Sequence, residues 1–248
     1  MVRMTPARRH FQRAMAAQAA EARAAAPMAG GEAVARAAAT EYELTLAELD
    51  TDLRALKVIQ AIDRKIALKR ELLPKYDAWV GGVIDAKAKP APQDNVLLHM
   101  MLWALDAEDY DRALDTVTYV LDNGLAMPAP FTRTAPTVIA EISAENALGH
   151  LSQGEACNLD WLTFVEDATK DGDMLDVVRA KLHKAMGLAY GRRAESDDEK
   201  QDGAAVSKSA LIEQALLWLR SALRLDGKAG VKKEIERLER LLKAQAAS

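Results

Sequence analysis

The feature that most constrains this chain is an apolar stripe of helical period between Thr40 and Pro74. Leucine and isoleucine recur there at steps of three and four residues, which places them on one side of an α-helix and leaves the other side charged. Thr40 suits the N-cap, and Pro74 suits the end because proline lacks a backbone N–H. We predict one long, coiled-coil-like helix whose stripe mediates self-association. The stripe consists of Leu46, Leu49, Leu53, Leu56, Ile59, Ile62 and Ile66.

The rest of the chain indicates an all-α protein. Ala, Leu, Glu, Lys and Arg dominate, and the alternating β-branched residues typical of strands are almost absent. The net charge of -4 argues against general coating of nucleic acid but permits a local basic surface. Cys157 is the single cysteine, which suits a reducing cytoplasm. No run of about 18 uncharged apolar residues occurs, so we expect no membrane association.

Composition divides the chain into three parts. Residues 1–39 form a basic, Ala-rich segment with few residues to bury, which we expect to be mobile alone and able to order on a partner. Residues 40–86 hold the long helix and a short one. A proline-containing break follows, and residues 93–248 form a helical bundle with an acidic, disordered insertion at 191–208. The pair Gly81-Gly82 either weakens the short helix or lets another backbone approach closely.

Within the bundle, the pattern predicts a helical hairpin that turns near Asp106–Asp109 and ends before Gly124. A later pair of helices partly matches the tetratricopeptide repeat pattern. The matching residues are Gly187, Tyr190, Ala215, Leu219 and Ala222. Two readings stay open for this part of the chain: a tetratricopeptide-like bundle, or plain hairpins with small residues where the helices cross.

The sequence offers no convincing catalytic or metal centre. Its acidic clusters lack an accompanying histidine, and helix capping or solubility explains each of them. These clusters are Asp106, Glu108 and Asp109; Asp171, Asp173 and Asp176; and Asp197, Asp198 and Glu199. The four histidines do not converge, and no phosphate-binding or nucleophile motif is present. We therefore expect no catalytic residue, no metal and no cofactor.

Distributed basic charge is the remaining candidate for function. Lysine and arginine neutralise backbone phosphates without reading bases, so such binding is sensitive to salt. The predicted DNA contacts are Arg3, Arg8, Arg9, Arg13, Arg64, Lys65, Lys69 and Arg70. For the four from the long helix a second reading stays open, because cations near a helix C-terminus also suit the helix dipole.

Several strings in the chain resemble the small terminase subunit of temperate contractile-tailed bacteriophages, a family also known as the terminase endonuclease subunit. They are Thr5-Pro6-Ala7-Arg8-Arg9-His10, Lys69-Arg70-Glu71-Leu72-Leu73-Pro74, Met101-Leu102-Trp103, Gly124-Leu125-Ala126-Met127-Pro128, Val178-Arg179-Ala180-Lys181-Leu182-His183-Lys184 and Gly230-Val231-Lys232-Lys233-Glu234-Ile235-Glu236-Arg237-Leu238-Glu239-Arg240. Their order and spacing extend the resemblance from near Thr5 to about Lys243.

The resemblance implies a role in DNA packaging in the host cytoplasm. Such a subunit recognises double-stranded viral DNA, engages the large ATPase-nuclease subunit, and commonly forms rings. We expect cleavage to reside in the large subunit, with a metal-dependent endonuclease or a tetratricopeptide-type adaptor as alternatives. A final apolar stripe suits either the large subunit or the chain's own core. It consists of Val231, Ile235, Leu238 and Leu242.

Overall fold

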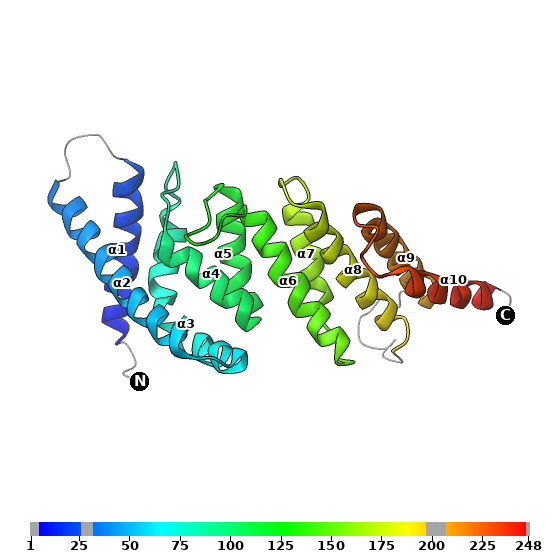
Figure 1. Cartoon of the computed structure of the whole chain (residues 1–248). Helices are drawn as coiled ribbons and strands as arrows, with labels where there is room; N and C mark the ends of the chain where they lie inside the picture. Colours follow the sequence, from blue (N-terminus) through cyan, green and yellow to red (C-terminus); the bar gives the residue numbers. More distant parts are fainter. Residues whose placement is uncertain (1–4, 26–31, 197–206, 247–248) are drawn as a thin grey trace. The chain divides into compact units, whose positions relative to one another are not determined.

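The computed structural model describes residues 5–25, 32–196 and 207–246 (Figure 1). Within these ranges the chain forms ten α-helices and no strand, so the prediction of an all-α protein is confirmed. The chain divides into two compact units, Met1–Ala135 and Pro136–Ser248. None of the helices in the described ranges is both long and apolar enough to cross a membrane.

The first unit contains five helices. They are α1 (Pro6–Ala24), α2 (Glu32–Val58), α3 (Ile62–Ala86), α4 (Asn95–Ala107) and α5 (Tyr110–Asp122). The remaining five are α6 (Ala135–Ser152), α7 (Leu159–Thr169), α8 (Asp176–Arg193), α9 (Lys208–Leu225) and α10 (Lys232–Ala246). The proline-containing segment expected to separate two domains joins α3 to α4 inside the first unit.

The prediction of one helix from Thr40 to Leu73 is wrong. Helix α2 begins before Thr40 and ends at Val58, and the chain turns through an extended Ala61 before α3 begins. No glycine or proline lies at this turn, so no local signal marks it. Pro74 instead lies inside α3, where the buried residues on both sides of it, Leu73 and Tyr76, outweigh the cost of one lost hydrogen bond.

The apolar stripe is consequently split between two helices. Leu49 and Leu56 are buried in the first unit, while Ile62 at the start of α3 is 72% exposed. The other four members, Leu46, Leu53, Ile59 and Ile66, are half-buried. The buried Leu49 and Leu56 thus serve the chain's own packing, while the role of the stripe in self-association stays a prediction. A single helix that carries the whole stripe is absent from the described residues.

Helix α1 is a packed element of the first unit and not a segment that is mobile alone. It lies against both α2 and α3 and buries Gln12 and three alanines, Ala16, Ala19 and Ala20. Gly82 of α3 faces it so closely that a Cβ atom there would lie 2.2 Å from the carbonyl oxygen of Arg13. Of the two readings of Gly81-Gly82, close backbone approach is confirmed.

The hairpin of α4 and α5 is confirmed with its turn in the predicted place. Glu108 adopts a left-handed conformation at the end of α4, and the Asp109 carboxylate caps α5 by accepting the backbone N–H of Arg112 at 3.3 Å. Gly124 follows α5 with φ of +60°, as expected for a glycine after a helix C-terminus.

In the second unit, small residues lie where α8 and α9 pack. A Cβ atom on Gly187 would lie 2.6 Å from Leu219 Cγ, and Ala215 and Ala222 are buried beside that leucine on α9. The close helix pair is as predicted, whereas its likeness to tetratricopeptide repeats stays a prediction. The acidic insertion is shorter than expected, because Gly191–Arg193 complete α8 and Lys208 begins α9. Residues 197–206 lie outside the described ranges.

The contact at Gly82 generates the first prediction. Gly82→Ala should lower the free energy of unfolding by about 1–3 kcal/mol, because the added methyl collides with the α1 backbone and with Ala16 Cβ at 2.7 Å. Gly81→Ala is the matched control, since its Cβ would meet only the flexible end of Arg13 at 3.4 Å. That control should gain up to about 1 kcal/mol in helix propensity. Urea unfolding followed by circular dichroism measures both, and equal stability of the two variants would refute the packing.

Candidate nucleic-acid interface

Arg8 and Arg9 project from the first turn of α1. Thr5 caps this helix by accepting the backbone N–H of Arg8 at 3.3 Å, and Pro6 occupies its first position. Both arginines are exposed, and their side chains make no hydrogen bond or ion pair with the described residues. The first turn contains no acidic residue, so these cations oppose the helix dipole without local compensation. They are therefore available for an external anion. Arg3, predicted beside them, lies outside the described residues.

Arg64 and Lys65 occupy the equivalent place on α3. Because the predicted long helix is broken at Ile59–Ala61, these residues lie in the first turn of a new helix and not near a C-terminus. The helix-dipole explanation of their charge is thus wrong. Arg64 is exposed and Lys65 half-buried, and neither side chain has a partner among the described residues.

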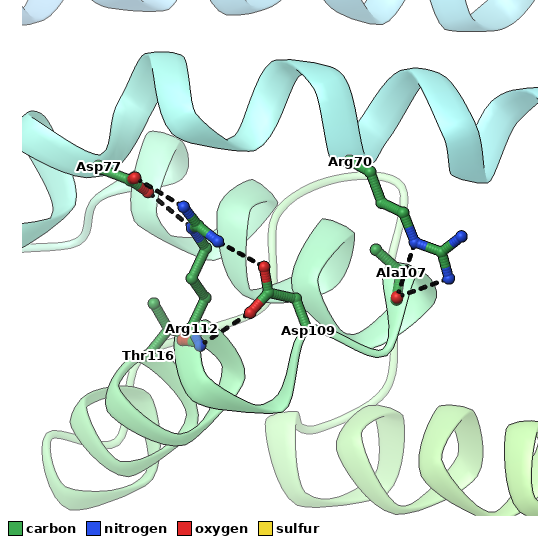
Figure 2. A network of polar contacts seen from close by, with 6 residues as sticks. All are labelled: Arg70, Asp77, Ala107, Asp109, Arg112 and Thr116. Atoms are coloured by element: carbon green, nitrogen blue, oxygen red, sulfur yellow. Dashed lines mark hydrogen bonds and ion pairs between the residues drawn. The ribbon is translucent and has the colours of Figure 1, made fainter.

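The other predicted basic contacts are used within the chain. Arg13 donates to Asp85 at 2.7 Å on the exposed side of α3. The Lys69 ammonium pairs with Asp106. Figure 2 shows Arg70 donating to the Ala107 carbonyl, from Nε at 3.1 Å and from Nη2 at 2.9 Å. Ala107 is the last residue of α4, so Arg70 satisfies a carbonyl that the helix leaves open. These two side chains hold the hairpin onto α3.

Arg112 makes a second tie between α3 and the hairpin. Its Nε and Nη2 donate to the two carboxylate oxygens of Asp77 at 2.8 Å each, and Nη1 donates to Asp109 at 2.5 Å (Figure 2). The hydrogen bond to Asp77 raises the pKa of Arg112 above its ordinary value, partly opposed by burial. The acidic residues at the hairpin turn therefore serve as counter-ions to Lys69 and Arg112, which explains them without a metal.

The predicted DNA contacts that have no partner among the described residues form two pairs near opposite ends of α3. Arg13 bonds Asp85 near the C-terminal end of α3, and Arg9 lies one turn from Arg13 on α1. Arg64 lies at the N-terminal end, 21 residues before Asp85 in the sequence, which corresponds to about 30 Å along a helix. The structure thus reduces the predicted cluster to two separate pairs, Arg8–Arg9 and Arg64–Lys65.

A buried polar network that the sequence did not predict holds α1 against α3 and α4. Asp94 is fully buried and caps α4, and its carboxylate accepts hydrogen bonds from the Leu97 N–H at 3.0 Å, Arg23 Nη2 at 2.6 Å and Trp79 Nε1 at 3.3 Å. The Arg23 guanidinium also lies 4.0 Å from the ring centroid of Tyr42, which stacks on Trp79. Burial, followed by the charge of Asp94, raises the pKa of Tyr42. A lone Asp before a helix was the available signal, but nothing in the sequence pointed to Arg23.

The remaining acidic and histidine residues form no metal centre within the described ranges. Asp171, Asp173 and Asp176 are exposed, and the cluster Asp197, Asp198 and Glu199 lies outside the described residues. His183 is buried in the second unit, where Nδ1 lies 3.0 Å from Ser221 Oγ and Nε2 lies 3.2 Å from Glu166 Oε2. His183 therefore contributes to the packing of the second unit.

The apolar stripe of α10 also turns inward. Val231, Ile235 and Leu238 are buried in a core shared with α9, and Leu242 packs against its edge. Of the two readings of this stripe, the structure supports the chain's own core for Val231, Ile235 and Leu238, so these three side chains offer no open docking face for a partner.

The comparisons with known proteins decide the family. The description "Phage small terminase subunit" belongs to a family model that matches residues 46–177, more than half of the chain. The chain belongs to the phage small terminase subunit family. The resemblance stated from the sequence is confirmed.

Two relatives of this small terminase subunit extend the match. The chain is 41% identical over 239 residues to "Terminase, endonuclease subunit" of Escherichia phage P2, covering 96% of this chain and 86% of the relative. It is 25% identical over 209 residues to "Probable terminase, endonuclease subunit" of Haemophilus phage HP1 (strain HP1c1), covering 84% and 73%. No solved structure matches.

The Asp94 network gives a prediction on the stability of this small terminase subunit. Asp94→Ala should lower the free energy of unfolding by about 3 kcal/mol, because it leaves the Arg23 charge in a largely buried place without its counter-ion. Asp85→Ala, the control, breaks the exposed pair with Arg13 and should cost less than about 1 kcal/mol. Thermal and urea unfolding measure both changes, and similar small losses would contradict the assigned role.

Proposed function

We propose that this chain is the DNA-binding small subunit of a phage packaging terminase. It binds double-stranded viral DNA through backbone phosphates and brings that DNA to the large subunit, which cuts and translocates it in the host cytoplasm. Membership of the small terminase subunit family supports this role. The proposal assigns the chain no bond-breaking step of its own.

The observation that carries the proposal is the placement of Arg8, Arg9, Arg64 and Lys65. Each pair lies in the first turn of a helix, where positive charge lowers helix stability. The first turn of α1 contains no acidic residue, whereas that of α3 contains Asp63. A phosphate would pair with the cations and also accept from the first-turn N–H groups that have no partner among the described residues, which are those of Ala7 in α1 and of residues 62–64 in α3. Binding thus compensates an electrostatic cost that the free chain carries.

The spacing of the pairs also suits a duplex. Arg64 and Asp85, the residue beside Arg13, lie about 30 Å apart along α3, which is close to one turn of B-DNA, about 34–36 Å. We therefore place the two pairs on phosphates about one helical turn apart. Four cations give only modest affinity at physiological salt, which favours several copies acting together. We therefore include self-association, as a ring, in the proposal, together with a contact to the large subunit.

This function predicts a specific change in the salt dependence of DNA affinity. Arg8→Ala/Arg9→Ala should weaken duplex binding in gel-shift titrations and make the plot of log affinity against log salt shallower by about 2, because each lost phosphate contact removes about 0.9. Lys170→Ala/Arg192→Ala removes the same charge from exposed side chains of the second unit and should leave the slope unchanged. Equal slopes of log affinity against log salt for the two variants would contradict the assigned phosphate contacts of Arg8 and Arg9.

A chain that binds only proteins gives a different result. A tetratricopeptide-type adaptor would show no salt-graded affinity for duplex DNA, with or without the arginine substitutions. The same titration therefore separates this alternative from the proposed function.

An intrinsic endonuclease is the second candidate, because both relatives are named as endonuclease subunits. We predict that the pure chain with Mg²⁺ leaves viral DNA intact and that cutting begins only when the large subunit is added. Agarose gels of a timed incubation test this. Cutting by the pure chain that disappears in Asp171→Asn/Asp173→Asn/Asp176→Asn would establish the enzyme instead. The Glu43→Gln/Glu71→Gln/Glu236→Gln variant removes the same number of charges from exposed residues and serves as the control.

A further inference from the structure

Helix α5 presents an acidic ridge to solvent. Asp111, Leu114, Asp115, Thr118 and Asp122 are all exposed and recur at steps of three and four residues along one face. None of the three carboxylates has an ion pair with a described residue, and Leu114 between them is 45% exposed. The opposite face of α5, with Ala113, Val117 and Val120, is buried in the first unit. The exposed face thus carries three carboxylates around one leucine and contacts no partner in the described part of the chain. We call these five residues the α5 ridge.

The second unit contains a groove of the opposite character between α9 and α10. It encloses about 940 Å³, several times the volume of a leucine side chain. Its lining includes Leu216, Leu217 and Leu242 as apolar walls, and Arg220, Arg224 and Lys243 as cations. Leu217 is 53% exposed. We call this surface the α9–α10 groove.

The charge left open in the α9–α10 groove is positive. Its lining also contains two glutamates. Glu239 pairs with Arg220 at 2.7 Å, whereas Glu213 has no partner among the described residues, so Arg224 and Lys243 against Glu213 leave a net positive charge. Arg224 donates to the Ser221 hydroxyl at 3.0 Å and Lys243 has no described partner, so neither of these cations meets a carboxylate. Basic residues outnumber acidic ones between Ser207 and Ala246, although the whole chain has a net charge of -4.

The two surfaces match in length as well as in charge. The α5 ridge runs from Asp111 to Asp122 and the α9 wall of the groove from Glu213 to Arg224, so each spans 11 residue steps, about 16 Å. An amphipathic helix laid into an apolar groove uses anchors at this helical spacing. Leu114 would enter among the leucines, while the carboxylates would meet Arg224 and Lys243.

We propose that the α5 ridge of one copy docks into the α9–α10 groove of a second copy. The occupant is a second copy because this chain itself carries both complementary faces, so the contact needs no other component. This contact deepens the self-association within the proposed function and uses none of the DNA-contacting residues. Each copy supplies one ridge and one groove, so the contact is head-to-tail and closes into a ring or continues as a filament.

Two variants test the contact. Asp111→Lys/Asp115→Lys reverses the ridge, and Arg224→Glu/Lys243→Glu reverses the groove. All four residues are exposed or line an open groove, so each variant should fold with the circular dichroism spectrum of the unaltered chain. Light scattering and native mass spectrometry of the full chain should show oligomers for the unaltered protein and monomers for either variant.

Mixing the two monomeric variants gives the decisive result. The ridge variant keeps its groove and the groove variant keeps its ridge, and the two reversed surfaces also carry opposite charges. The mixture should therefore form a dimer of one copy of each and larger oligomers in which the two variants alternate. Glu43→Lys/Glu71→Lys makes the same charge change on exposed residues of α2 and α3 and should leave the oligomer unchanged. A monomeric unaltered chain, variants with the unaltered mass, or no dimer on mixing would each overturn the proposal.

The outcome is separable from that of DNA binding. Duplex affinity of the monomeric ridge variant, measured with and without Arg8→Ala/Arg9→Ala, reports on the DNA contacts alone. Association of the two mixed variants without any DNA affinity would support this contact and refute the proposed DNA binding. Salt-dependent DNA affinity without association on mixing would support DNA binding and refute this contact.

Discussion

Asp94 joins four helices through one buried carboxylate. It caps α4, accepts from Trp79 of α3, and pairs with Arg23 of α1, whose guanidinium lies over Tyr42 of α2. A buried carboxylate is tolerated only when its hydrogen bonds are satisfied, and Asp94 achieves this only when all these elements are in place. The position of α1 therefore depends on this ion pair together with the close approach at Gly82.

The fixed position of α1 has a consequence for the basic residues. An Ala-rich helix that was free in solution would present its arginines in many orientations, and ordering it on DNA would cost conformational entropy. Packed against α3, it instead holds Arg8 and Arg9 in place at one end of that helix while Arg64 and Lys65 occupy the other. In the same unit, the side chains of Lys69, Arg70 and Arg112 hold the α4–α5 hairpin against α3. Basic charge in this unit is thus divided between holding the fold and remaining available outside it.

Local patterns in the sequence predicted the helices well and their packing poorly. The α4–α5 hairpin was predictable because a turn residue, a capping aspartate and Gly124 mark its ends. The turn between α2 and α3 was not, since no breaker stands there and the apolar period continues across it. Pro74 predicted a helix end that does not occur, because buried residues on both sides of it keep α3 helical through a residue that usually ends a helix.

The candidate site was predictable only as a list of cations. Periodicity cannot tell that Arg70 reaches a carbonyl 37 positions away or that Arg13 faces Asp85, because both contacts depend on tertiary structure. The sequence placed Arg64 and Lys65 near the C-terminus of a long helix, where the helix dipole favours cations. The structure places them in the first turn of α3, where the dipole disfavours cations. Arg23 went unnoticed because a single arginine among alanines carries no local sign of burial.

Hydrogen–deuterium exchange of the pure chain, with and without a duplex of viral DNA, tests the central claim most directly. The first-turn N–H groups of a helix have no intrahelical partner and exchange quickly, and a bound phosphate should slow them. The account predicts slower exchange on adding DNA at Ala7 and at residues 62–64, whose N–H groups have no hydrogen-bond partner in the described structure, with α8 unchanged. Slowed exchange confined to the second unit, or none at either helix start while DNA is bound, would contradict it.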